Sequence, residues 1–205
     1  MLPFRIDMDN LKVLKFGGTS VGTVESLRNV KAIVEGLDHP AIVVVSALGG
    51  LTDKLISTAR LAAEGDASYI EMMACFRRRH EDIITGVVPE SRIPEVREKV
   101  DALLDELEDR YKGLSLIRDL PERTLDEIVS FGERMSSVIV AAMLDNATHH
   151  NSLEFIKTEK WFSRNIADRP LTEHLICEEF GSELSRHAVT GGFISTDRDS
   201  GAVSY

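Results

Sequence analysis

The stretch KVLKFGGTSVG, residues 12–22, decides the fold that we expect. It is a short apolar run that carries one cation, Lys15, and closes at two glycines, Gly17 and Gly18. From residue 23 to residue 36 the apolar residues then recur at the three- and four-residue spacing of a helix. The sequence therefore predicts a strand over residues 13–16, a glycine loop and a helix.

The next segment repeats this order. Residues 41–46, AIVVVS, are apolar and mostly β-branched up to Ser46, which is typical of a strand covered on both faces in a parallel sheet. Gly49 and Gly50 follow, and residues 51–63 again have helical spacing. Strands that alternate with helices in this way predict an α/β fold with a mainly parallel sheet.

A charged helical excursion follows at residues 67–113. Pro89 and Pro94 interrupt it, so we predict two helices joined near residues 88–93. The remaining apolar patterns predict a helix over residues 121–144, a strand over 153–157, a helix over 171–186 and a strand over 188–195.

Composition limits the classes of partner. The chain has 34 acidic and 24 basic residues and a formal charge of −10, which argues against nucleic acid or an anionic membrane as the main partner. Cys75 and Cys177 have no CxxC spacing, and a reducing compartment is expected. Residues 1–10 lack a continuous apolar run, and no segment of the sequence is long and apolar enough for a membrane span. We expect a soluble, cytoplasmic protein.

No metal site is predicted from the sequence. His149 and His150 are adjacent and lack the spacing of metal ligands, so a solvated loop is expected there. The segment STDRDSG, residues 195–201, has alternating acidic residues, but the glycine and the distal glutamate of a calcium loop are not in place. An ordinary polar turn is the prediction for this segment.

Lys15 raises the main chemical question. Strand alternation puts Lys15 and Val13 on one face, close to an expected buried layer, and a buried ammonium needs an anion. Gly17 and Gly18 permit close backbone approach, while the hydroxyl of Ser20 and the following helix N-terminus add donors. Two interpretations stay open at this point, a phosphate site and a tight turn with the lysine extended along a sheet edge. Neither the P-loop pattern nor the dinucleotide pattern fits.

A second glycine loop, SALGGLTDK at residues 46–54, follows the second predicted strand. Ligands of open α/β sheets bind outside the carboxyl ends of the strands, so both loops are expected to face one crevice. Ser46 and Thr52 are the candidate side chains there, although Thr52 could instead cap the next helix. In SFGERMSS, residues 130–137, Glu133 could accept from a ligand ammonium or pair with Arg134 at the surface.

Taken together, KFGGTSVG, VVVSALGGLTD, SFGERMSS and VTGGFIS occur in an order and spacing that resembles the aspartate kinase branch of the amino acid kinase family. The resemblance covers nearly the whole chain. It implies a three-layer αβα sandwich and ATP-dependent phosphorylation of the L-aspartate side-chain carboxylate. It also implies that residues 1–205 form the N-terminal part of the catalytic domain, truncated before most of the nucleotide lobe and the ACT domains.

The resemblance also implies roles for individual residues. Lys15 would be catalytic and, with Gly17, Gly18 and Ser20, would contact ATP, which acts with Mg²⁺. L-aspartate would be held by a second set, namely Ser46, Thr52 and Glu133.

We expect this chain alone to have little activity and the full-length protein to be a homo-oligomer. The alternatives are a non-catalytic fragment that binds an amino acid or a partner, and a kinase for another small amino acid.

Overall fold

The computed structural model describes residues 11–162, 164–181 and 184–205. The prediction about residues 1–10 lies outside the described residues. Within them the helices are α1 (Val24–Glu35), α2 (Leu51–Glu64), α3 (Tyr69–Val87), α4 (Ile93–Ile117), α5 (Glu122–Met143), α6 (Ser152–Phe155) and α7 (Arg169–Phe180), with a 3₁₀ turn η1 (Glu90–Arg92). The strands are β1 (Lys12–Phe16), β2 (Ala41–Val45), β3 (Ala147–His149), β4 (Lys157–Trp161), β5 (Arg164–Ala167), β6 (His187–Gly191), β7 (Ser195–Asp197) and β8 (Val203–Ser204).

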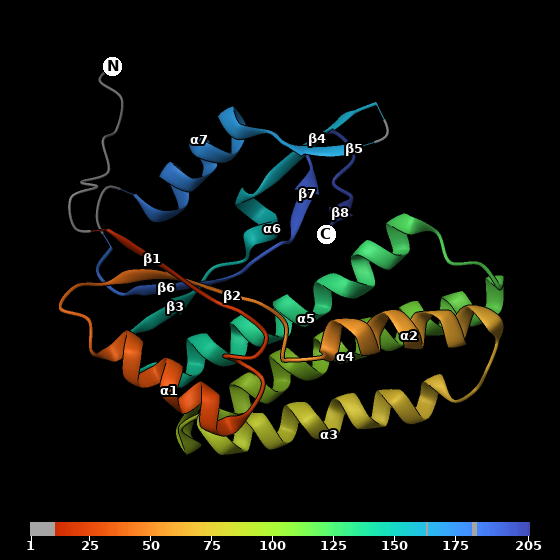
Figure 1. Cartoon of the computed structure of the whole chain (residues 1–205), viewed down its shortest axis with the longest axis horizontal. Coiled ribbons are helices and arrows are strands. Elements are labelled where there is room, and N and C mark those ends of the chain that lie inside the picture. The colour runs from red at the N-terminus through yellow and green to blue at the C-terminus, as the bar shows by residue number, and fades with distance from the viewer. Residues whose placement is uncertain (1–10, 163, 182–183) are drawn as a thin grey trace.

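Two sheets organise the molecule. Sheet A has the order β1-β2-β6-β3 and all its pairs are parallel, whereas sheet B has the order β5-β4-β7-β8 with parallel and antiparallel pairs. Figure 1 shows α1 to α5 on one side of sheet A, and α6, α7 and sheet B on the other. The predicted α/β class with a mainly parallel sheet between layers of helices is confirmed.

The β-branched strand β2 forms the centre of the core on its helix side. Ala41, Val43 and Val45 have no exposed surface, whereas Ile42 and Val44 on the opposite face are only half-buried. The prediction that this strand is covered on both faces therefore holds fully for the helix side only. The helices supply most of the burial, since α1 and α5 pack their apolar stripes against the same face.

The helical excursion is the predicted pair of helices. Helix α3 ends at Val87, η1 spans residues 90–92, and α4 begins at Ile93, so the break falls where the prolines predicted it. Tyr111 of α4 is fully buried and its hydroxyl donates to the carbonyl of Leu55 in α2, at 3.1 Å. This contact ties the pair to the helix that follows the second glycine loop.

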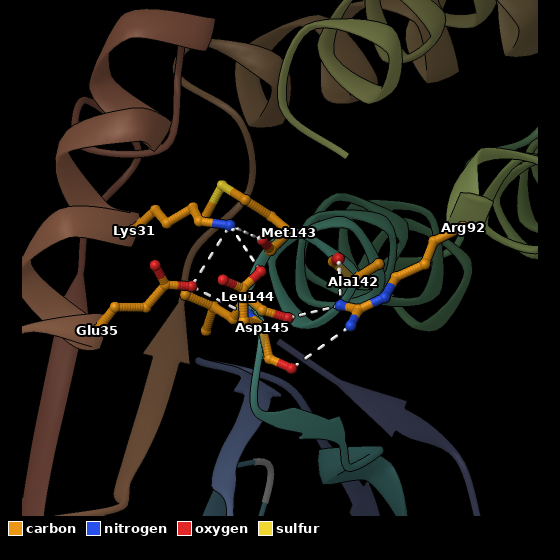
Figure 2. A network of polar contacts seen from close by, with 7 residues as sticks. All are labelled: Lys31, Glu35, Arg92, Ala142, Met143, Leu144 and Asp145. Carbon is orange, nitrogen blue, oxygen red and sulfur yellow. Dashed lines mark hydrogen bonds and ion pairs between the residues drawn. The ribbon is translucent and has the colours of Figure 1, made fainter. Parts of the chain in front are cut away.

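The carboxyl end of α5 is held by two cations from other elements. Arg92 donates to the carbonyl oxygens of Ala142 and Leu144 at 3.0 and 2.7 Å, and Lys31 of α1 donates to that of Met143 at 2.9 Å. Figure 2 shows both side chains converging on this end of the helix. Because the last carbonyls of a helix lack intrahelical partners, these bonds fix the end of α5.

Several boundaries differ from prediction because local signals were misjudged. Residues 152–155 form helix α6, not a strand, because the Asn151 side chain caps the turn by accepting from Leu153 N–H at 3.3 Å. The strand predicted over residues 188–195 is divided into β6 and β7 by Gly192 and by Phe193, whose φ is 57°. Helix α7 ends at Phe180, before Gly181 with its φ of 63°; the predicted extension includes residues 182–183, outside the described residues.

The solvated loop predicted for the two adjacent histidines is wrong for His149, which lies in a strand, whereas His150 follows that strand outside any helix or strand. His149 belongs to β3, which pairs with β6, and its Nε2 lies 3.0 Å from Ser137 Oγ. His150 Nδ1 lies 2.5 Å from a carboxylate oxygen of Glu179 in α7. The prediction failed because a three-residue strand carries too little pattern to be recognised without its partner strand.

Residues 195–197 of the segment STDRDSG form strand β7, and the predicted polar turn is confined to the residues that follow it. Asp197 Oδ1 accepts from the N–H groups of Asp199 and Ser200, at 3.2 and 2.7 Å. These bonds lower the pKa of the Asp197 carboxyl, with those from Ser200 contributing most. In the part of the chain that the structure describes, no helix has both the length and the apolar character needed to cross a membrane.

Candidate functional site

Lys15 is the second-to-last residue of β1, which is an edge strand of sheet A. Its side chain is exposed, and Nζ lies 4.2 Å from the centre of the Phe193 ring. The neighbouring Val13 is 62% exposed, so the buried layer expected beside Lys15 is not found at this edge. The ammonium thus faces an aromatic ring at the carboxyl ends of the strands.

The two glycine loops, which were expected to face one crevice, pack directly against each other. A Cβ built on Gly49 would lie 2.9 Å from the carbonyl oxygen of Gly18, and one on Gly18 would lie 3.2 Å from that of Ala47. A Cβ on Gly22 would lie 3.0 Å from the Gly18 carbonyl. Since real Cβ atoms need more space, these glycines are required for the close approach of the loops.

Gly17 has a different environment. A Cβ built there would meet no atom within 4 Å in the described part of the chain. Its carbonyl accepts from the N–H of Ser20 at 2.9 Å, which closes the turn before α1. No neighbouring residue among those described packs against the missing side chain of Gly17. A ligand could therefore approach the backbone closely at this position.

Arg79 of α3 joins the two loops from the helical excursion. Its Nη2 donates to the carbonyl of Gly49 at 2.6 Å and to that of Gly22 at 3.4 Å. The side chain is half-buried, and one guanidinium therefore holds both loops in register. Sequence reasoning missed this residue, because Arg79 lies in a run of three arginines on a charged helix.

Glu133 of α5 is buried at the same place, with 1% of its surface exposed. Oε1 accepts from the N–H of Ala47 at 3.1 Å and from the hydroxyl of Tyr205 at 3.4 Å, whereas Oε2 has no hydrogen-bond partner among the described residues. Burial raises the pKa of the Glu133 carboxyl to about 7, against the opposing effects of the Ala47 N–H and the charge of Lys15.

The surface ion pair considered for Glu133 is wrong. Arg134 points away and pairs with Glu106 of α4 at 3.1 Å, with its guanidinium over the Phe131 ring. Consecutive helical residues point in different directions, so the carboxylate enters the site while the guanidinium stays outside. A buried carboxyl group with one free oxygen is suited to receive a cationic group.

Ser46 and Thr52 flank the second loop. The N–H of Ser46 donates to the Phe16 carbonyl at 3.1 Å, and the carbonyl of Ser46 accepts from the Ser136 hydroxyl at 2.7 Å. The alternative role of Thr52 as a helix cap is wrong, because Gly50 occupies the cap position of α2 with a φ of 72°. Thr52 is a half-buried residue in the first turn of the helix, beside the Tyr205 hydroxyl.

The end of β6 completes the cluster. A Cβ on Gly191 would lie 3.2 Å from Glu133 Cβ, so α5 approaches this strand closely at the carboxylate. The sequence signal for this contribution was the glycine pair in VTGGFIS, although neither its contact with Glu133 nor that of Phe193 with Lys15 was predicted. Ends of β1, β2 and β6 thus meet around one region, as expected for a ligand site on a parallel sheet.

A separate hollow lies at the β3 edge. Its volume is about 320 Å³, and its lining includes Arg92, Glu95, Lys99, Asp145 and Arg186. Arg92 is already bonded to backbone carbonyls and Lys99 to Glu95, at 2.7 Å. With two carboxylates also in its wall, this hollow has little net charge to attract an ion, and we do not assign it a ligand.

The fold and this strand-end cluster define an α/β protein with a candidate ligand site at the carboxyl edge of its parallel sheet. The chain belongs to the amino acid kinase family, whose model matches residues 10–203. It is 30% identical to aspartokinase 1, chloroplastic, of Arabidopsis thaliana over 94% of this chain and 35% of that protein. It is 28% identical to lysine-sensitive aspartokinase 3 of Escherichia coli K12 over 93% of this chain and 42% of that protein.

Solved structures agree on the fold. The crystal structure of E. coli aspartokinase III with lysine and aspartate has a TM-score of 0.80 and 24% identity, over 96% of this chain and 43% of that one. The structure of the same enzyme with aspartate and ADP has a TM-score of 0.79 and 24% identity, over 95% and 43% of the two chains. The chain thus spans less than half the length of these relatives.

Proposed function

We propose that the protein containing this chain is an aspartokinase, which transfers the γ-phosphoryl group of ATP to the side-chain carboxylate of L-aspartate. The product would be 4-phospho-L-aspartate, the first intermediate toward lysine, threonine and methionine. The observation that carries the proposal is the meeting of an exposed lysine, two packed glycine loops and a buried glutamate at the ends of β1, β2 and β6. The aspartokinase names of the relatives support it.

The phosphate end of the proposed site consists of Lys15, Gly17, Gly18 and Ser20. In the reaction, a carboxylate oxygen of aspartate forms a bond to the γ-phosphorus while the bond to the bridging oxygen breaks, and ADP leaves. Both reactants are anions, so catalysis requires positioning and charge stabilisation and needs no covalent intermediate. The Lys15 ammonium would stabilise the transferring group, and the open backbone at Gly17 would let N–H groups approach phosphate oxygens.

The amino-acid end consists of Ser46, Thr52 and Glu133. We propose that Glu133 Oε2, which lacks a partner among the described residues, accepts from the α-ammonium of aspartate. An ammonium there would stabilise the ionised carboxylate and oppose the effect of burial on its pKa. The Thr52 hydroxyl at the start of α2 would provide a further hydrogen bond.

Mg²⁺ is part of the proposal as the ion carried by the nucleotide, whose charge it would partly neutralise. Among the residues that the structure describes, no group of three or more His, Cys, Asp or Glu side chains is placed to hold a metal. Mg²⁺ commonly binds through substrate phosphates, water and only one or two carboxylates. An ion brought by ATP therefore does not require a cluster of three protein ligands. We assign no residue of this chain to it.

The remaining expectations belong to the whole protein. We propose that it acts as a homo-oligomer in the cytoplasm, and that residues 1–205 alone have little activity because they match about a third of the plant relative. The name of the plant relative gives the chloroplast as its compartment, which differs from the one proposed here. Fractionation of the source cells tests the proposed compartment. Size-exclusion chromatography with light scattering tests the oligomer.

The function is tested by ADP release from the complete protein with L-aspartate or L-glutamate as acceptor. The proposal expects turnover with aspartate and an acyl phosphate product that reacts with hydroxylamine. Turnover with glutamate but not with aspartate would overturn the choice of substrate. If neither acceptor gives ADP although calorimetry detects aspartate binding, the chain serves binding alone.

A further inference from the structure

Phe193 has a backbone conformation that its own burial does not explain. Among the described residues, the non-glycine residues with positive φ are Arg118, Phe162 and Phe193, at 57°, 54° and 57°. Such a conformation is unfavourable for a bulky side chain and persists where the surroundings impose it. Arg118 ends α4 and donates to the carbonyl of Glu64 at 2.6 Å, whereas the Phe193 side chain is 65% exposed.

The ring of Phe193 is directed at the proposed catalytic cation. Lys15 Nζ lies 4.2 Å from the ring centre, although β2 separates the strand of Lys15 from β6, the strand that precedes Phe193. The lysine side chain therefore crosses Val44, its register partner on β2. A Cβ on Gly192 would lie 3.0 Å from Val44 Cγ1 and 3.9 Å from Lys15 Cε, so the bare glycine leaves this path open.

An aromatic face is a suitable partner for a cation that must exchange partners during a reaction. The ring attracts the ammonium through its quadrupole but does not neutralise its charge. A carboxylate in the same place would form a charge-assisted hydrogen bond, which is stronger and would compete with phosphate oxygens. The Glu133 carboxylate is near enough for Lys15 to lower its pKa, and the ring gives the ammonium another contact.

We propose that Phe193 is a positioning residue for Lys15. The left-handed backbone at the end of β6 turns the ring toward the ammonium, which stays at the strand ends until phosphate oxygens replace the ring as its partner. The inference rests on the proposed role of Lys15 in phosphoryl transfer. It explains why the chain keeps a strained, exposed phenylalanine at this position.

The test compares Phe193→Gly, Phe193→Leu and Phe193→Tyr in the complete protein, with ADP release and thermal unfolding as the measurements. Loss of the ring should reduce kcat by roughly two- to fivefold, because a cation–π contact at an exposed site is modest. KM for L-aspartate should change much less, and Phe193→Tyr should keep activity near that of the parent. Phe193→Gly should not lower Tm, since glycine adopts a positive φ freely.

Phe162→Gly is the matched control. Phe162 is also aromatic, has a positive φ and is 91% exposed, but its ring lies edge-to-face against Trp161 in the β4–β5 hairpin. This variant should keep the parent kcat. An equal loss of kcat in both glycine variants would contradict a specific role for Phe193, and so would an unchanged kcat in Phe193→Gly.

The Lys15→Met background separates this inference from the proposed function. If Phe193 acts through Lys15, adding Phe193→Leu to Lys15→Met should give no further loss of kcat. A further loss of roughly two- to fivefold would contradict the positioning role while leaving the function intact. Full activity in Lys15→Met alone would instead overturn the proposed role of the lysine, and the inference with it.

Discussion

Two regions beside helix α5, its carboxyl end and the strand ends near Glu133, differ in whether their polar groups have hydrogen-bond partners. At its carboxyl end, Arg92 and Lys31 supply donors to successive backbone carbonyls (Figure 2). Beside the strand ends, Glu133 is buried with an oxygen that has no partner among the described residues, and Lys15 is exposed beside the strained Phe193. The carbonyl groups at the end of α5 have donors, whereas a carboxyl oxygen at the strand ends has no partner among the described residues.

This difference indicates which region maintains the fold and which is prepared for a ligand. Buried polar groups are nearly always paired in folded proteins, because an unpaired one costs free energy. A free buried oxygen and a strained backbone therefore lower stability unless something binds there. The predictions below test the contrast, beginning with the largest expected effect.

Lys15→Met should reduce kcat in the complete protein about a hundredfold or more, the size seen when one charge-stabilising donor is removed from an active site. Lys12→Met is the control, since Lys12 is an exposed lysine at the other end of β1. It should keep kcat near that of the parent. Similar losses in both variants would assign the effect to strand β1 rather than to the site.

Glu133→Gln should make stability less dependent on pH. Because burial raises the pKa of Glu133 to about 7, the folded state binds more protons than the unfolded state between the ordinary pKa and 7. Stability is therefore present at low pH and lost as pH rises through this range, by at most about 3 kcal/mol. The variant should be the more stable protein at pH 8 and nearly equal to the parent at pH 4.

Urea unfolding of parent and variant at both pH values measures this difference. Glu122→Gln, an exposed position on the same helix, should change little at either pH. The Glu133→Gln variant should also bind L-aspartate more weakly in calorimetry, since its amide cannot pair with the ammonium as a charge. If Glu133→Gln is less stable than the parent at pH 8, the Glu133 carboxylate does not lower stability there, and the contrast between the two regions fails.

Arg92→Ala should lower the free energy of unfolding by about 1–3 kcal/mol, because the carbonyls at the end of α5 lose part-buried charged donors. Arg97→Ala is the comparison, since Arg97 forms an exposed ion pair with Glu81 of the kind that contributes at most about 1 kcal/mol. Both variants should keep the parent KM for aspartate. A raised KM in Arg92→Ala alone would mean that the carboxyl end of α5 also shapes the site.

Arg79→Ala should give the smallest effect, a several-fold fall in kcat/KM as the two glycine loops lose their common donor, on the order of 1 kcal/mol. Arg78→Ala provides the control, because Arg78 is an exposed neighbour whose guanidinium lies 3.4 Å from Cys75 Sγ. Steady-state kinetics with both substrates distinguishes the two. An equal kcat/KM for Arg79→Ala and Arg78→Ala would show that the two glycine loops keep their relative position without Arg79.

Most of the fold could be predicted from local pattern. Apolar runs that end in glycine pairs identified β1 and β2, and two prolines identified the break between α3 and α4. Strand β3 and the sheet B strands β4, β5 and β8 were missed, because these short segments lack the continuous apolar run that identified β1 and β2. The Asn151 cap, a purely local signal, was available and overlooked.

The candidate site divides in the same way. The sequence by itself determined that a lysine and two glycine loops would lie at the ends of neighbouring parallel strands, since that follows from alternating strands and helices. Only the tertiary structure decided that Glu133 is buried with a raised pKa and that Phe193 faces Lys15. Burial and through-space contact depend on segments that are distant along the chain, and no local pattern encodes their approach.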